Sequence, residues 1–193
     1  MPNQTHPLLT THARLALPDW IEAEVDTEAT YPDDAARMAL AVRLSALNVE
    51  RGTGGPFGAA IFDAGGRLLA VGVNRVVPET SSIAHAEMMA YLLAQKHTGR
   101  ARLNDGHPGI TLAASGQPCC MCYGATFWAG IDTLLIGASS ADVMELTEFD
   151  EGPLPDDWRG ELERRGITVR EGIARDAARA VLDRYARGGG THY

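Results

Sequence analysis

Residues 110–138 read ITLAASGQPCCMCYGATFWAGIDTLLIGA, and this stretch decides the fold. The apolar runs at 110–115 and 133–138 are typical of buried strands. Between them, residues 119–130 predict a helix that starts directly after Pro118. A strand, a helix and a second strand in succession indicate an α/β architecture.

The same alternation extends over the rest of the chain. Residues 64–67 (AGGR) predict a hairpin turn between two apolar runs. The other expected helices start near residues 19, 33, 84, 141, 161 and 174, and the other expected strands span 57–63, 68–74 and 167–170. We therefore expect an N-terminal extension (1–31) whose first ten residues are poorly ordered, one α/β domain (32–187) and a flexible tail (188–193).

Length and charge limit the functional classes. A chain of 193 residues and 20.6 kDa is long enough for a single domain. Its net charge of −8 repels a phosphate backbone, so nucleic acid is an unfavourable partner. No apolar run approaches the roughly 18 residues of a membrane span, and the N-terminus lacks a secretory signal pattern. The expected location is the cytoplasm.

The three cysteines all lie within four positions, at Cys119, Cys120 and Cys122. A disulfide framework would spread its cysteines along the chain, and an odd cluster cannot pair completely. Tightly spaced cysteines in a reducing compartment indicate metal or redox chemistry instead. Cys120 is expected to be a packed apolar side chain.

A metal site can be assembled from two helix starts. The two-residue gap between Cys119 and Cys122 lets both thiolates bind one tetrahedral zinc ion, and His85 is the expected third ligand. Three protein ligands leave a fourth position for water, as in catalytic zinc sites. Glu87 follows His85 by two residues and could carry protons without binding the metal.

The pattern His-x-Glu followed by Pro-Cys-x-x-Cys is the signature of zinc-dependent base deaminases. Over about residues 33–150 the chain resembles the cytidine deaminase superfamily, and within it the branch of guanine deaminases and tRNA adenosine deaminases. Further matching features are 54–61 (GGPFGAAI), Asn74, the Phe127-Trp128 pair, the Phe149-Asp150 pair and the terminal Tyr193.

The resemblance implies a three-layer α/β/α fold with a central mixed sheet, one Zn²⁺ held by His85, Cys119 and Cys122, and a proton shuttle at Glu87. It also implies a homodimer in which the C-terminal segment ending at Tyr193 covers the partner's site. The residues that would contact the base are Asn74, Phe57, the Ala86 backbone and an auxiliary acid, Asp150 or equally Glu151. Trp128 could be either a core residue or a wall of the substrate site, and Asn74 could instead only organise a turn.

The expected reaction is hydrolytic deamination of a free nucleobase or nucleoside, with guanine or a related amino-purine favoured and ammonia released. Gln117 departs from the glutamate that guanine deaminases usually have before their Pro-Cys pair. Three alternatives stay open: a cytosine, aminopyrimidine or aminotriazine deaminase, a tRNA adenosine deaminase, and a catalytically silent binding module. Retention of Glu87 argues against the last, because a structural zinc site needs no proton shuttle.

Overall fold

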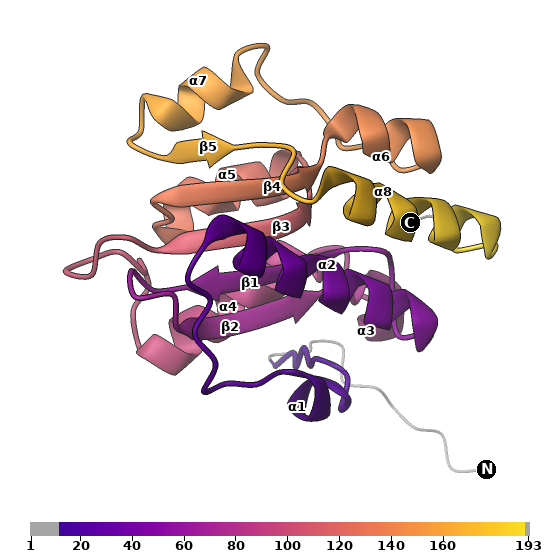
Figure 1. Cartoon of the computed structure of the whole chain (residues 1–193), viewed down its shortest axis with the longest axis horizontal. Coiled ribbons are helices and arrows are strands. Elements are labelled where there is room, and N and C mark those ends of the chain that lie inside the picture. Colours follow the sequence, from indigo (N-terminus) through magenta and orange to yellow (C-terminus); the bar gives the residue numbers. More distant parts are fainter. Residues whose placement is uncertain (1–11, 192–193) are drawn as a thin grey trace.

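A computed structural model describes residues 12–191 and has a five-stranded mixed sheet at its centre (Figure 1). The strand order is β2-β1-β3-β4-β5. β1 pairs antiparallel with β2 and β3, whereas β3, β4 and β5 are parallel. The strands are β1 (Gly58–Phe62), β2 (Leu68–Val73), β3 (Thr111–Gly116), β4 (Thr133–Ala138) and β5 (Thr168–Arg170). The predicted α/β class and mixed sheet are confirmed.

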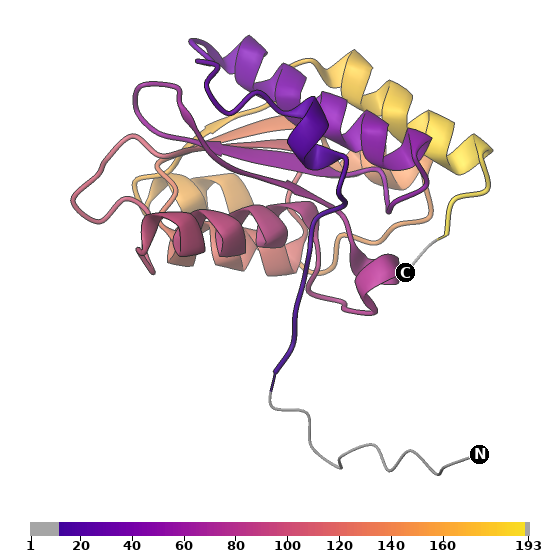
Figure 2. The same cartoon turned by 90° about the horizontal axis from the view of Figure 1, so that it is seen from below.

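Helices cover both faces of the sheet, which gives three layers (Figure 2). One face carries α2 (Asp34–Glu50), α6 (Ser140–Leu146) and α8 (Arg175–Arg187). The other carries α4 (Ala86–Thr98), α5 (Cys120–Ala129) and α7 (Trp158–Glu163). Because helices cover both faces, β1 and β3 are buried along their whole length, and their residues are apolar or small.

Helix α4 sits unusually close to the sheet, and a glycine explains why. A Cβ added to Gly72 of β2 would lie 1.9 Å from the carbonyl oxygen of Ala86, at the first turn of α4. Only a residue without a side chain allows this approach. The contact fixes the start of α4, where His85 and Glu87 are located, directly on β2.

One helix was not predicted. Helix α3 (Val76–Glu79) is a single turn between β2 and the start of α4. It contains Pro78, and Thr80 ends it in a left-handed conformation, with φ at 51°. A single turn gives no apolar periodicity for a sequence pattern to reveal. All the helices and strands that were predicted are present, with boundaries within a few residues of those expected.

The described part of the N-terminal extension packs on the domain. Helix α1 (Ile21–Glu24) buries Ile21 against the α2 side of the core, together with partly buried Leu17 and Trp20. At the other end, the Tyr185 hydroxyl donates a hydrogen bond to the Thr191 carbonyl, and Gly190 N–H donates to the Tyr185 carbonyl. The expected tail at residues 1–10 and the terminal Tyr193 lie outside the described residues.

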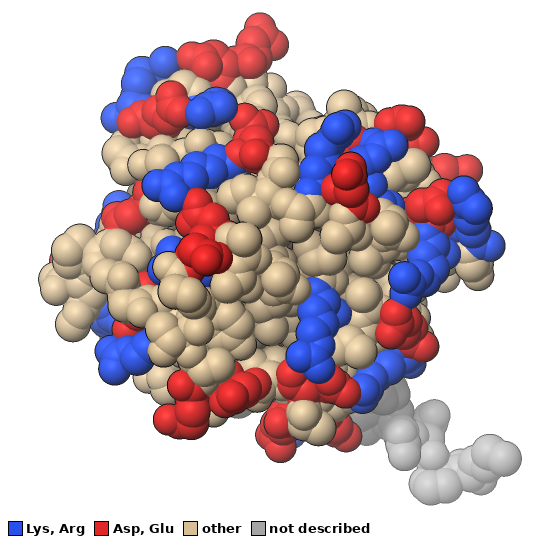
Figure 3. Space-filling model, viewed as in Figure 1, with Lys and Arg blue, Asp and Glu red and all other residues tan. Residues whose placement is uncertain are grey.

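Charges of both signs are interspersed on the face shown in Figure 3, so no single-sign surface dominates there. Within residues 12–191, no helix is long and apolar enough to cross a bilayer.

Candidate metal and substrate site

Two helix N-termini meet at the candidate site, and each has a metal-ligating residue at its cap. His85 is the N-cap residue of α4, and Cys119 is the N-cap residue of α5. Cys122 lies in the first turn of α5 and is fully buried. The Gln117 N–H donates to the Ala138 carbonyl, which ties the segment before α5 to the end of β4. The unpaired N–H groups and dipole at such a helix start favour thiolates.

The three side chains form a set of metal ligands. Nδ1 of His85 lies 3.5 Å from Sγ of Cys119 and 3.7 Å from Sγ of Cys122. Ligand atoms around a tetrahedral zinc are separated by roughly 3.5 to 3.8 Å, as follows from Zn–N and Zn–S bonds of about 2.0 and 2.3 Å. None of the three cysteines forms a disulfide. His85, Cys119 and Cys122 are therefore positioned to bind a metal ion.

The electrostatics of the thiols suit a cation. A hydrogen bond from Cys122, together with His85, lowers the pKa of the Cys119 thiol to about 4 despite its burial. The same hydrogen bond, with burial, raises the pKa of Cys122. Burial lowers the pKa of His85, but its hydrogen bond to Cys119 and the charge of Glu87 raise it above the ordinary value overall. The lowered pKa of Cys119 favours the thiolate form, which is the form that binds a metal ion.

Glu87 lies in the first turn of α4, beside the ligands but outside the ligand set. Its side chain is buried, and this burial, reinforced by the negative charge of Cys119, raises its pKa to about 7. A carboxyl group that titrates near neutrality can both accept and donate a proton.

A cavity opens beside the metal ligands, and it collects most of the residues expected to contact a base. Its wall includes three of the four proposed metal-site residues, and Cys122 lies behind them. The lining residues are Phe57, Asn74, His85, Ala86, Glu87, Gln117, Cys119, Phe149, Asp150 and Glu151. The structure thus brings together Asn74, Phe57 and Ala86 from three separate segments.

The side chain of Asn74 has a fixed orientation. Its Oδ1 accepts a hydrogen bond of 3.2 Å from Val76 N–H at the start of α3. The backbone of Asn74 is held by the carbonyl of Phe57 and by the side chain of Asn48. Asn74 therefore both organises the turn before α3 and lines the cavity. The two N–H donors of its Nδ2 are available to a ligand.

The two candidate auxiliary acids differ in their placement. Asp150 is exposed, and its Oδ1 accepts a hydrogen bond from Gly152 N–H. Glu151 is 8% exposed, and burial together with the charge of Cys119 raises its pKa to about 8. The Glu151 carbonyl accepts a hydrogen bond from Cys120 N–H, which fixes this loop to α5. Of the two carboxyl groups, the one at Glu151 is the buried one.

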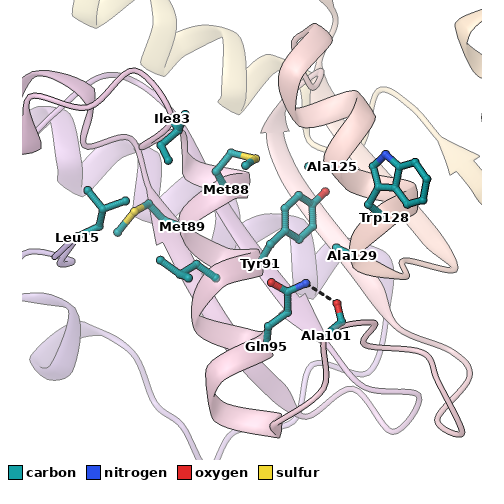
Figure 4. Close-up of a pocket in the computed structure, with 11 residues that line it drawn as sticks. Leu15, Ile83, Met88, Met89, Tyr91, Gln95, Ala101, Ala125, Trp128 and Ala129 are labelled. Atoms are coloured by element: carbon teal, nitrogen blue, oxygen red, sulfur yellow. Dashed lines mark hydrogen bonds between the residues drawn. The ribbon is translucent and has the colours of Figure 1, made fainter. Parts of the chain in front are cut away.

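Trp128 occupies neither of the two places expected for it. Its side chain is 74% exposed on α5, and it borders a different pocket, between α4 and α5 (Figure 4). The reason is helical phase, because the buried side of α5 is formed by Cys122, Thr126 and Ala129, while Trp128 projects outward. Trp128 therefore does not contact the metal-site cavity of its own chain. Cys120, expected to be packed, is exposed next to Gly152.

Two cavity residues were not expected to contact substrate. Phe149 is buried and meets Phe57 with ring centroids 5.4 Å apart. Gln117 is buried, and its Oε1 accepts a hydrogen bond from Ser140 N–H. Two sequence features could have drawn attention to these residues: the Phe149-Asp150 pair, and Gln117 in place of the usual glutamate. Neither feature shows in which direction a side chain points.

The fold and the ligand set define a zinc-binding deaminase. Residues 32–138 match the cytidine and deoxycytidylate deaminase zinc-binding region, and the chain belongs to this family. It is a hydrolytic deaminase that acts on C–N bonds.

Solved structures and sequence relatives agree with this. The structure of guanine deaminase from Nitrosomonas europaea is 40% identical, covers 93% of this chain and 98% of its own, and has a TM-score of 0.87. The protein NE0047 in complex with 2,6-diaminopurine is 42% identical, covers 93% and 95%, and also has a TM-score of 0.87. Guanine deaminase from Bacillus subtilis is 38% identical over 111 residues, 58% of this chain and 67% of the relative.

Proposed function

We propose that this chain is a guanine deaminase that converts guanine and water to xanthine and ammonia. The carrying observation is the similarity to guanine deaminase from Nitrosomonas europaea over nearly the whole of both chains. The cavity supports it, because Asn74, Phe57 and Ala86 converge on the wall beside the metal ligands. A flat apolar wall with a few polar groups is suited to a heteroaromatic base.

In this proposal, His85, Cys119 and Cys122 hold Zn²⁺, which when bound supplies an acidic water as the nucleophile. Glu87 accepts a proton from that water and delivers it to the ring nitrogen next to the amino carbon. The water oxygen bonds to the amino-bearing carbon, and Glu87 carries the remaining proton of that oxygen to the amino group. The C–N bond then breaks, so that ammonia leaves and a carbonyl group remains on the carbon. Phe57 packs against one face of the base, and Nδ2 of Asn74 donates a hydrogen bond to an acceptor on it.

Glu151 is the better candidate for the auxiliary acid. Both acids line the cavity, but Glu151 is buried whereas Asp150 is exposed. Variants of NE0047 with substitutions at an asparagine and at a glutamate have been solved with 8-azaguanine. That asparagine and that glutamate are separated along their chain by the same number of residues as Asn74 and Glu151. We propose that Glu151 exchanges a proton with the bound base.

The test is ammonia release by the zinc-loaded protein from guanine, guanosine, adenine, cytosine, cytidine, an aminotriazine and a tRNA. We expect turnover of guanine, lost after chelation and restored by Zn²⁺. Turnover of cytosine without guanine would select the pyrimidine alternative, and salt-sensitive tRNA deamination would select the RNA alternative. Zinc-loaded protein that is silent on the whole panel would contradict the proposal.

We also propose that the chain forms a homodimer through the face formed by α4 and α5. This face has an apolar hollow of about 350 Å³ lined by Leu15, Met88, Leu92 and Ala125, with exposed Trp128 and Ile83 beside it (Figure 4). Exposed apolar patches of this kind mark association surfaces.

A reducing compartment such as the cytoplasm suits a site that depends on two free thiols.

Light scattering tests the dimer. Wild type should have twice the 20.6 kDa chain mass, and Trp128→Glu should shift it toward the monomer. Met144→Glu is the matched control, because Met144 is an exposed apolar residue on α6, on the opposite face. A wild-type mass near 20.6 kDa at assay concentration would contradict the homodimer.

A further inference from the structure

The N-terminal extension is tied by hydrogen bonds to the corner of the cavity that holds Asn74. Its described part, from residue 12, crosses the β2 edge of the sheet before α1 lies beside α2 (Figure 2). Besides ion pairs of Glu24 with Arg43 and Arg51, it forms hydrogen bonds with Thr53 and with Arg75, the residue next to Asn74. These hydrogen bonds of the described part of the extension support the backbone around Asn74, the proposed contact of the base, and do not involve the metal ligands.

Arg75 joins three segments through one guanidinium group. Its Nε donates to the Ala16 carbonyl at 3.2 Å, and its Nη1 donates to the Thr53 carbonyl at 2.5 Å. Its Nη2 pairs with Glu79 of α3 at 3.1 Å. The Arg75 side chain is only 13% exposed, so these bonds are largely shielded from water. A rigid, planar fork with five donors can make such contacts, and an ammonium group cannot reach all three.

A second connection runs from Trp20 through a chain of donors. The indole N–H of Trp20 donates to Oγ1 of Thr53 at 3.0 Å, and the Thr53 hydroxyl donates to Oδ1 of Asn48 at 2.8 Å. Nδ2 of the fully buried Asn48 then donates to the carbonyls of Gly55 and Asn74, at 2.8 and 2.9 Å. In each of these bonds the group nearer to Trp20 donates to the next one, so the hydrogen bonds connect Trp20 to Asn74 in one direction.

At the end of this relay, the backbones of Gly54 and Asn74 are packed so closely that neither can move without the other. A Cβ at Gly54 would lie 1.9 Å from the Asn74 carbonyl oxygen, so the loop and the end of β2 are in direct backbone contact. A shift of the loop therefore moves the backbone of Asn74, and Phe57 with it, because Asn74 N–H donates to the Phe57 carbonyl.

We propose that the N-terminal extension positions the base-binding corner, with Trp20 and Arg75 as positioning residues. Trp20 acts on Asn74 through Thr53 and Asn48, and Arg75 acts through the Thr53 carbonyl and its own peptide link to Asn74. The proposal rests on the assignment of Asn74 as a contact of the base. Misplacement of one hydrogen-bonding group weakens base binding but leaves the metal ligands and Glu87 in place. The predicted signature is therefore a raised KM with little change in kcat.

The test compares Trp20→Phe and Arg75→Lys with wild type in guanine turnover, zinc content and 8-azaguanine binding by calorimetry. Trp20→Phe keeps an aromatic ring beside Arg51 and removes the N–H donor together with the smaller ring of the indole. We expect KM and the 8-azaguanine Kd to rise about threefold to tenfold in each variant, which is the effect of one lost or loosened hydrogen bond. Values of kcat should stay within about twofold of wild type, and zinc content should be unchanged.

Arg43→Gln is the matched control. It removes an ion pair with Glu24 of the same extension, but it touches neither Thr53 nor Arg75. Its KM should equal that of wild type. The proposal is overturned if Trp20→Phe and Arg75→Lys lower the melting temperature but leave KM and Kd unchanged, or if they lower kcat alone. Wild type that neither deaminates guanine nor binds 8-azaguanine would instead overturn the proposed function.

Discussion

The metal corner and the proposed base-binding corner of this cavity are built in different ways. The metal corner comes from two short motifs at two helix starts, with all ligand atoms within 4.8 Å of one another. The base-binding corner draws Phe57, Asn74 and Glu151 from three loops, held by residues as distant as Asn48. The first is specified locally by the sequence, and the second only by the whole fold. We expect substitutions in the first to affect chemistry and those in the second to affect substrate binding.

Glu87→Gln should cause the largest loss of kcat among these variants. A smaller loss would contradict the assignment of the chemistry to the metal corner. The amide cannot transfer protons, so kcat for guanine should fall about 10³- to 10⁴-fold. Because Glu87 is not in the ligand set, zinc content should stay at one ion per chain. Parallel kinetics and metal analysis check both statements. Loss of zinc together with activity would mean that Glu87 maintains the metal site.

Glu151→Gln should lower kcat about 100-fold, as expected for loss of a buried proton-exchanging group. Asp150→Asn is the neighbouring control, and its kcat should remain near wild type because the Asp150 carboxylate, although it lies on the cavity wall, is exposed to solvent and accepts the hydrogen bond of the local turn. Steady-state kinetics of the pair decides between the two acids. The reverse order of effects would assign the role to Asp150.

Asn74→Asp tests whether the base-binding corner contributes to substrate binding. The variant keeps an oxygen for Val76 N–H, so α3 should remain capped, but it replaces the Nδ2 donor with an acceptor. We expect KM for guanine to rise at least about tenfold, because a buried donor to the base is lost. Kinetics with a circular dichroism melt separates this from unfolding. An unchanged KM would show that Asn74 only organises the turn.

Asp142→Asn should affect stability and not chemistry. The buried Asp142 carboxylate pairs with Arg175 and Arg179 and caps α6 through Ser139, which lowers its pKa. We expect a loss of about 2 kcal/mol in the free energy of unfolding at pH 7, with kcat unchanged per folded molecule.

The pH dependence of this difference has a definite sign. A carboxyl group whose pKa is lowered on folding contributes stability above its unfolded pKa, and that contribution disappears as the pH falls through the folded value. The unfolding free energies of wild type and Asp142→Asn in urea should therefore begin to converge below about pH 4, the unfolded pKa of an aspartate, and approach each other further as the pH falls toward the lowered folded value. A difference that is constant from pH 7 to pH 2 would assign the effect to packing instead.

The sequence predicted those features that depend on local patterns. Strands β3 and β4 and the helix between them follow from apolar runs and a proline, and the ligand set follows from the Cys-x-x-Cys spacing with His85. Helix α3 was missed because one turn has no periodicity. The exposure of Trp128 and the choice between Asp150 and Glu151 depend on side-chain direction, which a one-residue difference in phase reverses.

The hydrogen bond from Cys120 N–H to the Glu151 carbonyl has an observable consequence. The Cys120 amide belongs to the first turn of α5 and has no partner within the helix, so it is protected from solvent only while the loop at residue 151 is in place. Its hydrogen–deuterium exchange rate therefore measures how often that loop opens. A slow exchange that becomes slower with 8-azaguanine would identify the loop as the gate through which ligand passes.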